Sequence, residues 1–255
     1  MAEVYRSNHP TLGLPVAIKL LPPAFAGDPN FRLRFIREAQ VIAKLEHPNI
    51  VRVFDYGEQD GTHYIIMEYL TGKDLANFLR VNGRLSLTDA LPIILGIASA
   101  LDYAHQQGVV HRDVKPSNVM LDPHQGIGSD VIRPVLTDFG IAKILGGDTA
   151  LTRTATLGTF DYIAPEQIQA SAEVDGRADV YAFGVMVYQI LTGELPFKHN
   201  NPGALLMAHM AQPAPDPRES VRDLPEGAAY AIRRAMAKSI HERYASAGEF
   251  AKDLG

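Results

Sequence analysis

The chain has 255 residues, 46% of them hydrophobic, which is enough to bury a core in one large domain or two small lobes. Its 24 lysine and arginine residues against 29 acidic residues give a formal net charge of −5 without any basic block, which argues against a nucleic-acid-binding protein. The absence of cysteine excludes disulfide scaffolds and cysteine-ligated metal sites.

Membrane segments and targeting signals are not expected in this chain. The most apolar segments, 90–101 and 180–191, are shorter than the roughly 18 residues that a membrane-spanning helix needs, and are better explained as core helices. The first ten residues contain no apolar stretch of the kind found in signal peptides. We therefore expect a cytoplasmic domain, which a longer natural protein could join to a membrane anchor.

Short strands and one helix are predicted for the first third of the chain, and longer helices for the rest. β-branched and aromatic runs indicate the strands, whereas apolar residues at helical spacing indicate the helices. We therefore expect a small β-rich lobe followed by a larger helical lobe. The predicted strands are 15–21, 50–56 and 63–69, and the predicted helices are 30–46, 90–106, 179–191 (with Gly193 as C-cap) and two within 227–254.

Two opposite charges are predicted to face inward in the first lobe. Lys19 lies within an apolar strand, where a lysine by itself more often extends its amine to solvent. Glu38, however, precedes Ile42 by four residues and Leu45 by seven, which places a carboxylate on the apolar face of its helix. Because an unpaired buried charge is costly, we expect Lys19 and Glu38 to form an ion pair.

The segment 111–118 (HRDVKPSN) gathers polar side chains directly before an apolar strand. Asp113 and Asn118 are five residues apart, a spacing that suits a loop turning both side chains toward one point. Asp138, within LTDFG, adds a third oxygen donor. Carboxylate and amide oxygens in a partly open site suit Mg²⁺ that is bridged to phosphates. A solvated charged turn is the simpler alternative, but it leaves the ordered set of Lys19, Glu38 and these three residues unexplained.

With these motifs the chain resembles the protein kinases, specifically the bacterial serine/threonine kinases of eukaryotic type. The resemblance spans essentially the whole chain. It implies an α+β, two-lobed kinase fold in a single catalytic domain, 1–255, with a small lobe at 1–67 that lacks its first strand, a hinge at 68–72 and a large lobe at 73–255. The matching strings are VAIK (16–19), REAQVIAKLEHPNIV (37–51), MEYLTGKDL (67–75), HRDVKPSN (111–118), DFG (138–140), APE (164–166) and RADVYAFGVMVYQILTGELPF (177–197).

The resemblance implies transfer of the γ-phosphate of ATP, with Mg²⁺, to serine and threonine hydroxyls of protein substrates. Lys19 would contact the α- and β-phosphates and be positioned by Glu38. Asp113 would orient the substrate hydroxyl and accept its proton, while Lys115 would neutralise charge on the transferred phosphoryl group. The implied metal ligands are Asn118 and Asp138. The implied adenine site has Met67 as gatekeeper, Glu68 and Leu70 in the hinge, and Val4, Ala17 and Met120 around the ring, although ordinary core packing would explain these apolar residues equally well.

An activation loop is implied between Asp138 and Glu166. Arg112, directly before the catalytic aspartate, implies control by loop phosphorylation, since a phosphate can order a segment by pairing with arginine. We expect self-association with autophosphorylation at Thr152 or Thr154, ahead of Thr156. The resemblance also implies that Thr159, with Lys115, marks serine/threonine specificity, that Asp179 braces the catalytic loop, and that Glu166 and Arg243 form an ion pair that ties the end of the activation loop to the large lobe.

Two features depart from the family pattern. The glycine-rich loop G-x-G-x-x-G-x-V would end at Val4, which places Ala2 at the last glycine and the other two glycines before Met1. We therefore expect a chain truncated within that loop, with Met1 an internal methionine; the alternative is a catalytically impaired, pseudokinase-like binding module. A small-molecule kinase is disfavoured because Thr159, APE and the long loop serve protein substrates. The second departure, 122–134, predicts a surface loop without an assigned function.

Overall fold

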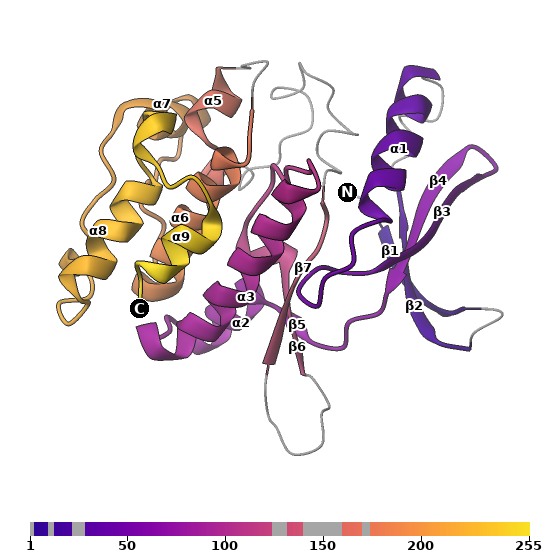
Figure 1. Cartoon of the computed structure of the whole chain (residues 1–255), viewed down its shortest axis with the longest axis horizontal. Coiled ribbons are helices and arrows are strands. Elements are labelled where there is room, and N and C mark those ends of the chain that lie inside the picture. The colour runs from indigo at the N-terminus through magenta and orange to yellow at the C-terminus, as the bar shows by residue number, and fades with distance from the viewer. Residues whose placement is uncertain (1–2, 10–12, 22–28, 124–131, 140–159, 170–173) are drawn as a thin grey trace.

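The computed structural model describes residues 3–9, 13–21, 29–123, 132–139, 160–169 and 174–255. Figure 1 shows a sheet with helix α1 beside it on one side of the molecule, and a larger, mainly helical part on the other. The chain passes from the first part to the second after β4. The predicted α+β fold with two lobes is therefore confirmed, whereas the exact limits assigned to lobes and hinge stay a prediction.

The small lobe contains a four-stranded antiparallel sheet in the order β1-β2-β4-β3. Across β2 and β4, Ala17 lies opposite Met67 and Lys19 lies opposite Ile65. Residues directly opposite share a face of the sheet, and Ile65 and Met67 are buried in a cluster with Phe35 of α1. Lys19 therefore lies on the face that α1 covers. The elements are β1 (Glu3–Asn8), β2 (Pro15–Leu20), α1 (Pro29–Ile42), β3 (Val53–Gln59) and β4 (Thr62–Glu68).

Several boundaries in the small lobe differ from the sequence prediction: β3 begins at Val53 instead of residue 50, and β1 lies where no strand was predicted. Strand β3 continues to Gln59, because Asp60 and Gly61 have positive φ angles of 52° and 75° and close a two-residue hairpin turn. Helix α1 ends at Ile42 instead of residue 46. Ile42 and Leu45 are buried in the core cluster of the large lobe, so the residues at the end of α1 pack against that lobe.

Helix α6 forms the centre of the large lobe, with nearly all of its residues buried. It ends at Gly193, whose φ of 80° is the predicted left-handed C-cap. Helix α3 begins at Leu87, earlier than predicted, because Ser86 caps it by accepting a hydrogen bond from the Asp89 N–H. The helices are α2 (Leu75–Asn82), α3 (Leu87–Gln106), α5 (Pro165–Ile168), α6 (Arg177–Thr192), α7 (Pro202–Ala211), α8 (Glu226–Ala235) and α9 (Ala247–Lys252), with 3-10 turns η2 (Pro116–Asn118), η4 (Phe160–Tyr162), η5 (Pro217–Glu219) and η6 (Ile240–Glu242).

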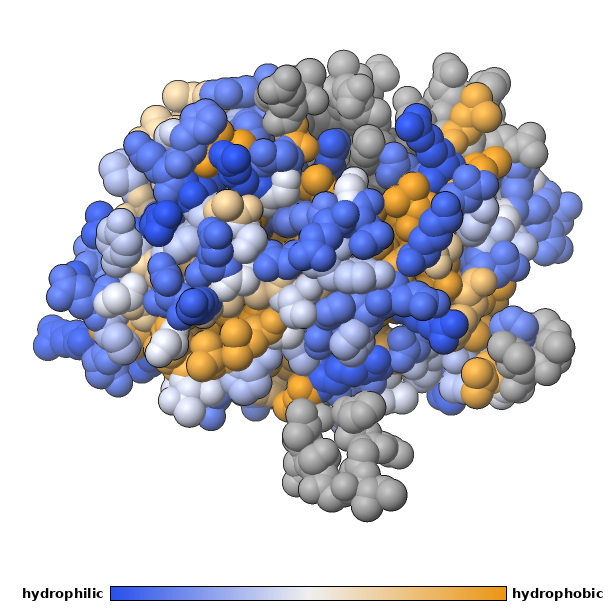
Figure 2. Space-filling model, in the orientation of Figure 1, coloured by the Kyte–Doolittle hydropathy of each residue, from blue (hydrophilic) through white to orange (hydrophobic). Residues whose placement is uncertain are grey.

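Helix α3 is, within the described ranges, the one helix long and apolar enough to cross a membrane by length and composition, with a mean hydropathy of 1.3. It packs against α6, α9 and β7. Ile94, Ile97 and Leu101 on that side are fully buried. The apolar residues of α3 thus contribute to the core of the large lobe, and on the face shown in Figure 2 hydrophilic residues cover most of that lobe.

A three-stranded sheet, β5 (Lys73–Asp74), β6 (Val119–Pro123) and β7 (Ile132–Leu136), lies between the small lobe and the helices. The predicted surface loop 122–134 is wrong at both ends, because Asp122 pairs with Arg133 and Pro123 pairs with Ile132 as a continuation of the β6–β7 ladder. Residues 124–131 lie outside the described part of the chain. This hairpin positions the candidate site: HRDVKPSN precedes β6, and Asp138 follows β7.

Candidate active site

The predicted catalytic loop, 111–118, is built around the buried carboxylate of Asp179 in the first turn of α6. Its two oxygens accept hydrogen bonds from the backbone N–H groups of His111 and Arg112, each at 2.8 Å. His105 Nε2 also contacts Asp179 Oδ2 at 2.7 Å. Arg112 has a φ of 67°, which is uncommon for a residue other than glycine. Asp179 therefore holds a backbone turn that the chain by itself disfavours, which is the geometry that a brace of this loop requires.

His111 joins this loop to the DFG motif. Its ring is fully buried and contacts that of Phe139, with 4.5 Å between the centroids. His111 Nε2 lies 2.9 Å from the Thr137 carbonyl oxygen, and Nδ1 accepts a hydrogen bond from the Asp113 N–H at 3.2 Å. These contacts require the proton on Nε2, because a carbonyl accepts and an N–H donates.

The carboxylate of Asp113 is held by two neighbours in the same loop. Lys115 Nζ lies 2.9 Å from its Oδ1 and 2.7 Å from its Oδ2. Asn118 donates from Nδ2 to the backbone oxygen of Asp113 at 2.8 Å and to Oδ2 at 3.0 Å. Because the amide nitrogen of Asn118 is used in this way, its oxygen is the atom left to bind a metal ion. The loop thus brings together the three polar residues that the sequence singled out there.

Asp138 lies beside Asn118 because β6 and β7 are paired. The backbone N–H and the hydroxyl of Thr137 both donate to the Asn118 carbonyl, at 2.9 and 3.1 Å. The carboxylate of Asp138 forms an ion pair with Lys19 Nζ at 2.7 Å. Lys19 is only 7% exposed, so this partner compensates a buried ammonium group. The amine of the small lobe and the carboxylate of the large lobe therefore meet in the space between the lobes.

Glu38 is half-buried on α1. The ion pair that the structure gives Lys19 is the one with Asp138, and the pairing of Lys19 with Glu38 stays a prediction.

The donor set fits Mg²⁺ better than a transition metal. Among the described residues, no group of three histidine, cysteine, aspartate or glutamate side chains could hold a metal by itself. Asn118 and Asp138 instead offer an amide and a carboxylate oxygen at the end of one hairpin. Mg²⁺ in phosphate-transfer sites is held by one or two such ligands and completed by phosphates and water.

Most of the residues assigned to adenine lie around one apolar cluster. Met67, 8% exposed, belongs to the buried cluster of the small lobe, and Ala17, Leu70 and Met120 pack against it from β2, the segment after β4, and β6. Val4 differs, because it is 62% exposed on β1, opposite Lys19. These positions suit an apolar ring, and the adenine contacts stay a prediction.

Glu68 takes part in an ionic cluster that sequence reasoning missed. Arg133 Nη2 lies 2.6 Å from Glu68 Oε1 and 2.9 Å from Asp122 Oδ2, and Arg133 Nη1 donates to the Pro48 carbonyl at 3.3 Å. Asp122 also accepts hydrogen bonds from the N–H and the hydroxyl of Thr71. We call Glu68, Thr71, Asp122 and Arg133 the hinge cluster, because they connect the predicted hinge, 68–72, to the β6–β7 hairpin.

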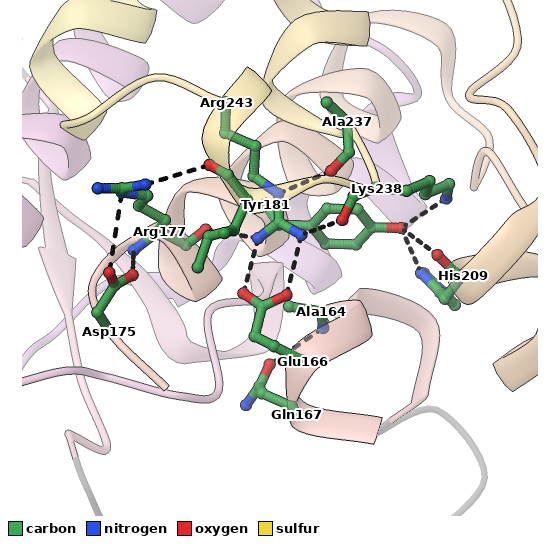
Figure 3. A network of polar contacts seen from close by, with 11 residues as sticks. Ala164, Glu166, Gln167, Asp175, Arg177, Tyr181, His209, Ala237, Lys238 and Arg243 are labelled. Carbon is green, nitrogen blue, oxygen red and sulfur yellow. Dashed lines mark hydrogen bonds and ion pairs between the residues drawn. The ribbon is translucent and has the colours of Figure 1, made fainter. Parts of the chain in front are cut away.

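The predicted ion pair between Glu166 and Arg243 is present and bidentate, with distances of 2.7 and 2.9 Å (Figure 3). The guanidinium group has no exposed surface, and it also donates to the carbonyls of Ala237, Arg177 and Lys238. Such complete pairing is what a buried charge needs. Helix α5, which carries Glu166, is thereby attached to the large lobe.

Titratable groups beside this pair have shifted pKa values. Burial and, second, the charge of Arg243 lower the pKa of Lys238 to about 8. Burial, with a further contribution from Lys238, lowers the pKa of His209 to about 3. Tyr181 connects them, because its hydroxyl lies 2.9 Å from His209 Nδ1 and 3.1 Å from Lys238 Nζ (Figure 3). At neutral pH the buried His209 is therefore uncharged.

Three of the predicted site residues lie outside the part of the chain that the structure describes, and three residues that contact the site were not predicted. Thr152, Thr154 and Thr159 lie outside the described residues. His105, Arg133 and Gln167 contact the site without having been singled out. Their partners are distant in sequence, and no motif of residue types identifies them. Apolar periodicity alone places His105 on a helix and gives no sign that Asp179 lies beside it.

Comparison with known proteins agrees with this geometry. A model of the protein kinase domain matches residues 1–250. The serine/threonine-protein kinase PknJ of Mycobacterium tuberculosis is 42% identical over 254 residues, which cover 98% of this chain and 42% of PknJ. The probable serine/threonine-protein kinase PknB of Bifidobacterium longum is 38% identical over 266 residues, which cover 100% of this chain and 37% of that protein. The chain thus spans about two fifths of the length of these relatives.

Solved structures agree as well. The crystal structure of the Mycobacterium tuberculosis PknI kinase domain has a TM-score of 0.78 at 36% identity and covers 100% of this chain and 90% of that one. The structure of Rad53 1-466 in complex with AMP-PNP has a TM-score of 0.78 at 27% identity and covers 98% of this chain and 60% of that one. The family model matches nearly the whole chain, and these relatives agree with it along the same length, so the chain belongs to the protein kinase domain family.

Proposed function

We propose that the chain is a Mg²⁺- and ATP-dependent serine/threonine protein kinase. The observation that carries this proposal is the meeting of Lys19 and Asp138 at 2.7 Å, beside the group formed by Asp113, Lys115 and Asn118. A cationic amine from one lobe and oxygen donors from the other lie on two sides of one space, as transfer of a charged phosphoryl group requires.

Each side chain has a role that its contacts support. Lys19 binds the α- and β-phosphates, and Asn118 and Asp138 hold Mg²⁺, which neutralises charge on the phosphates when it is bound. Lys19 and Asp138 attract each other through their opposite charges. Nucleotide binding gives each of them a new partner and leaves Lys19 available to Glu38 as well.

Asp113 is the proposed base. Its carboxylate orients the hydroxyl of the substrate and accepts its proton, and Lys115, now at 2.7 Å from that carboxylate, moves its charge toward the transferred phosphoryl group. Lys115 and the serine/threonine kinases among the relatives support serine and threonine as acceptors. Self-association with phosphorylation of Thr152 or Thr154, recognition of protein substrates near Thr159, and a cytoplasmic location of this domain belong to the same proposal.

The test is transfer of labelled γ-phosphate from ATP to a mixture of protein substrates. Wild type should produce phosphoserine and phosphothreonine, and Asp113→Asn should lose on the order of 100-fold or more of the rate, because a general base contributes at least that much. Asp223→Asn, the same change at an exposed position, is the matched control and should be active.

The outcomes separate the alternatives. Equal labelling by wild type and Asp113→Asn would refute the role of Asp113. If the chain binds nucleotide but shows no phosphate transfer that depends on Asp113, a pseudokinase-like binding module is favoured. Phosphorylation of small hydroxyl compounds, with proteins unlabelled, would indicate a small-molecule kinase.

A further inference from the structure

We propose that Gln167 is a positioning residue for Asp113, an inference that rests on the proposed kinase function. Gln167 is half-buried in α5, and its side-chain amide makes two hydrogen bonds. Oε1 accepts from the N–H of Ala164, the N-cap residue of α5, at 3.0 Å (Figure 3). Nε2 donates at 3.0 Å to the backbone carbonyl of Arg112, 55 residues away in sequence.

The Arg112 carbonyl belongs to the peptide group that leads into Asp113. A peptide group is planar, so its carbonyl and its N–H turn together. Gln167 holds the carbonyl, and His111 Nδ1 accepts the Asp113 N–H of the same group. With both ends bonded, the orientation of this plane is restrained, and with it the position of the Asp113 Cα, which lies in the plane.

The other backbone groups of this turn are held by other residues. Asp179 accepts the N–H groups of His111 and Arg112, and Asn118 donates to the Asp113 carbonyl. The Arg112 carbonyl is therefore the group in this turn whose support comes from α5. The left-handed φ of 67° at Arg112 indicates that contacts hold this turn, because the backbone by itself disfavours that conformation.

Helix α5 is a firm support for this bond. Glu166, the residue before Gln167, is fixed by Arg243, and Ala164 is completely buried. Figure 3 shows Glu166 directed toward Arg243 and Gln167 lying beside Ala164. Because α5 contains Glu166, the end of the predicted activation loop, Gln167 connects the end of that segment to the residue before the base. A displacement of α5 would remove the hydrogen bond and loosen Asp113.

A purely structural role as a helix cap is the competing explanation, and Gln167→Glu separates the two. Glutamate keeps an oxygen that accepts from the Ala164 N–H, as glutamine and glutamate both do at this position of a helix. In place of the Nε2 donor, glutamate puts a second oxygen opposite the Arg112 carbonyl. An ionised carboxylate has no proton to donate to that carbonyl. Gln169→Glu, which introduces the same charge at the exposed C-cap of α5, is the matched control.

The experiment measures kcat, the KM for ATP and melting temperature for wild type, Gln167→Glu, Gln167→Ala and Gln169→Glu. A positioning role requires that kcat of Gln167→Glu fall about 10-fold or more, since small displacements of reacting groups have effects of this size. Its KM for ATP and melting temperature should stay near those of wild type. Gln167→Ala should lose both kcat and melting temperature, and Gln169→Glu should behave as wild type. A wild-type kcat in Gln167→Glu, or an equal loss in Gln169→Glu, overturns the proposal.

Hydrogen exchange of segment 111–118 gives a readout that needs no catalysis. Exchange in Gln167→Glu should be faster than in wild type and in Gln169→Glu. If wild type transfers no phosphate, the proposed kinase function fails while exchange still decides the role of Gln167. Unchanged exchange in that case overturns the positioning role.

Discussion

Replacement of Arg243 by methionine should destabilise the large lobe more than any exposed ion pair can. Arg243 Nη1 and Nη2 bind both oxygens of Glu166, and the same guanidinium group donates to three backbone carbonyls. Methionine fills part of the volume but donates nothing. The carboxylate of Glu166, in a residue only 9% exposed, is then left without its counter-charge.

The size of the effect follows from burial. Removing one partner of a buried ion pair costs about 3–5 kcal/mol. In domains of 150–250 residues, 1 kcal/mol shifts the melting temperature by about 2–4 °C. We therefore expect Arg243→Met to lower the free energy of unfolding by about 4 kcal/mol and the melting temperature by about 10 °C.

Urea unfolding and thermal melting of the purified chain measure both quantities. Lys198→Ala is the control, because it breaks an exposed i,i+4 pair with Glu194, in which the side chains are 57% and 60% exposed, and should cost at most about 0.5 kcal/mol. A loss below about 1 kcal/mol in Arg243→Met would refute the reasoning, because it would place the pair in the range of exposed ones. Adding Glu166→Gln to Arg243→Met should recover part of the stability, since a neutral amide costs less to leave unpaired than a carboxylate. No recovery would assign the loss to packing.

Three further outcomes follow from the same contacts. Arg133→Met breaks the hinge cluster, whose side chains are partly exposed. The free energy of unfolding should therefore fall by only about 1–2 kcal/mol, and the KM for ATP should change. If both quantities stay at their wild-type values, the cluster does not hold the predicted hinge. Burial lowers the pKa of His209 from 6.5 to about 3. Between pH 6.5 and about pH 3, His209 therefore binds a proton in the unfolded chain but not in the folded chain. As the pH falls through this range, the free energy of unfolding should decrease by about 1.4 kcal/mol per pH unit. His209→Gln should have a shallower dependence, and an identical slope would contradict this origin. Phosphopeptide mapping of active chain should find phosphate on Thr152 or Thr154, and no modified threonine within 149–159 would count against autophosphorylation there.

The sequence predicted those parts of the site in which the functional side chains lie close together along the chain. Asp113, Lys115 and Asn118 lie within one short loop, so a motif records almost all of their mutual contacts. An anionic partner for Lys19 was also predicted, because a lysine on the covered face of a strand needs one, but the predicted partner was Glu38 and the structure pairs Lys19 with Asp138. Which carboxylate serves as that partner depends on whether phosphates and a metal lie between the lobes, and periodicity carries no information about that.

The contacts that the sequence missed have backbone atoms or distant charges as partners. Gln167 donates to a carbonyl, and every residue has one, so no residue type at position 112 signals the bond. Arg133 looked like part of a polar insertion because glycines and charges follow Asp122, yet its position in β7 is fixed by strand register. The burial of Ile42 at the end of α1 likewise depends on packing against the large lobe, which helical periodicity does not record.

The supports of the catalytic loop form a closed ring that begins and ends on α6. Asp179 of α6 holds the Arg112 N–H, the Arg112 carbonyl accepts from Gln167, and Glu166 next to Gln167 is bound by Arg243. Arg243 returns to α6 by donating to the carbonyl of Arg177 at 3.1 Å. Because α6 is almost completely buried, both ends of the ring are attached to a closely packed element of the large lobe. Helix α5 is thus joined to α6 through Arg243 and to the catalytic loop through Gln167, so the same few contacts support both α5 and the residue before Asp113.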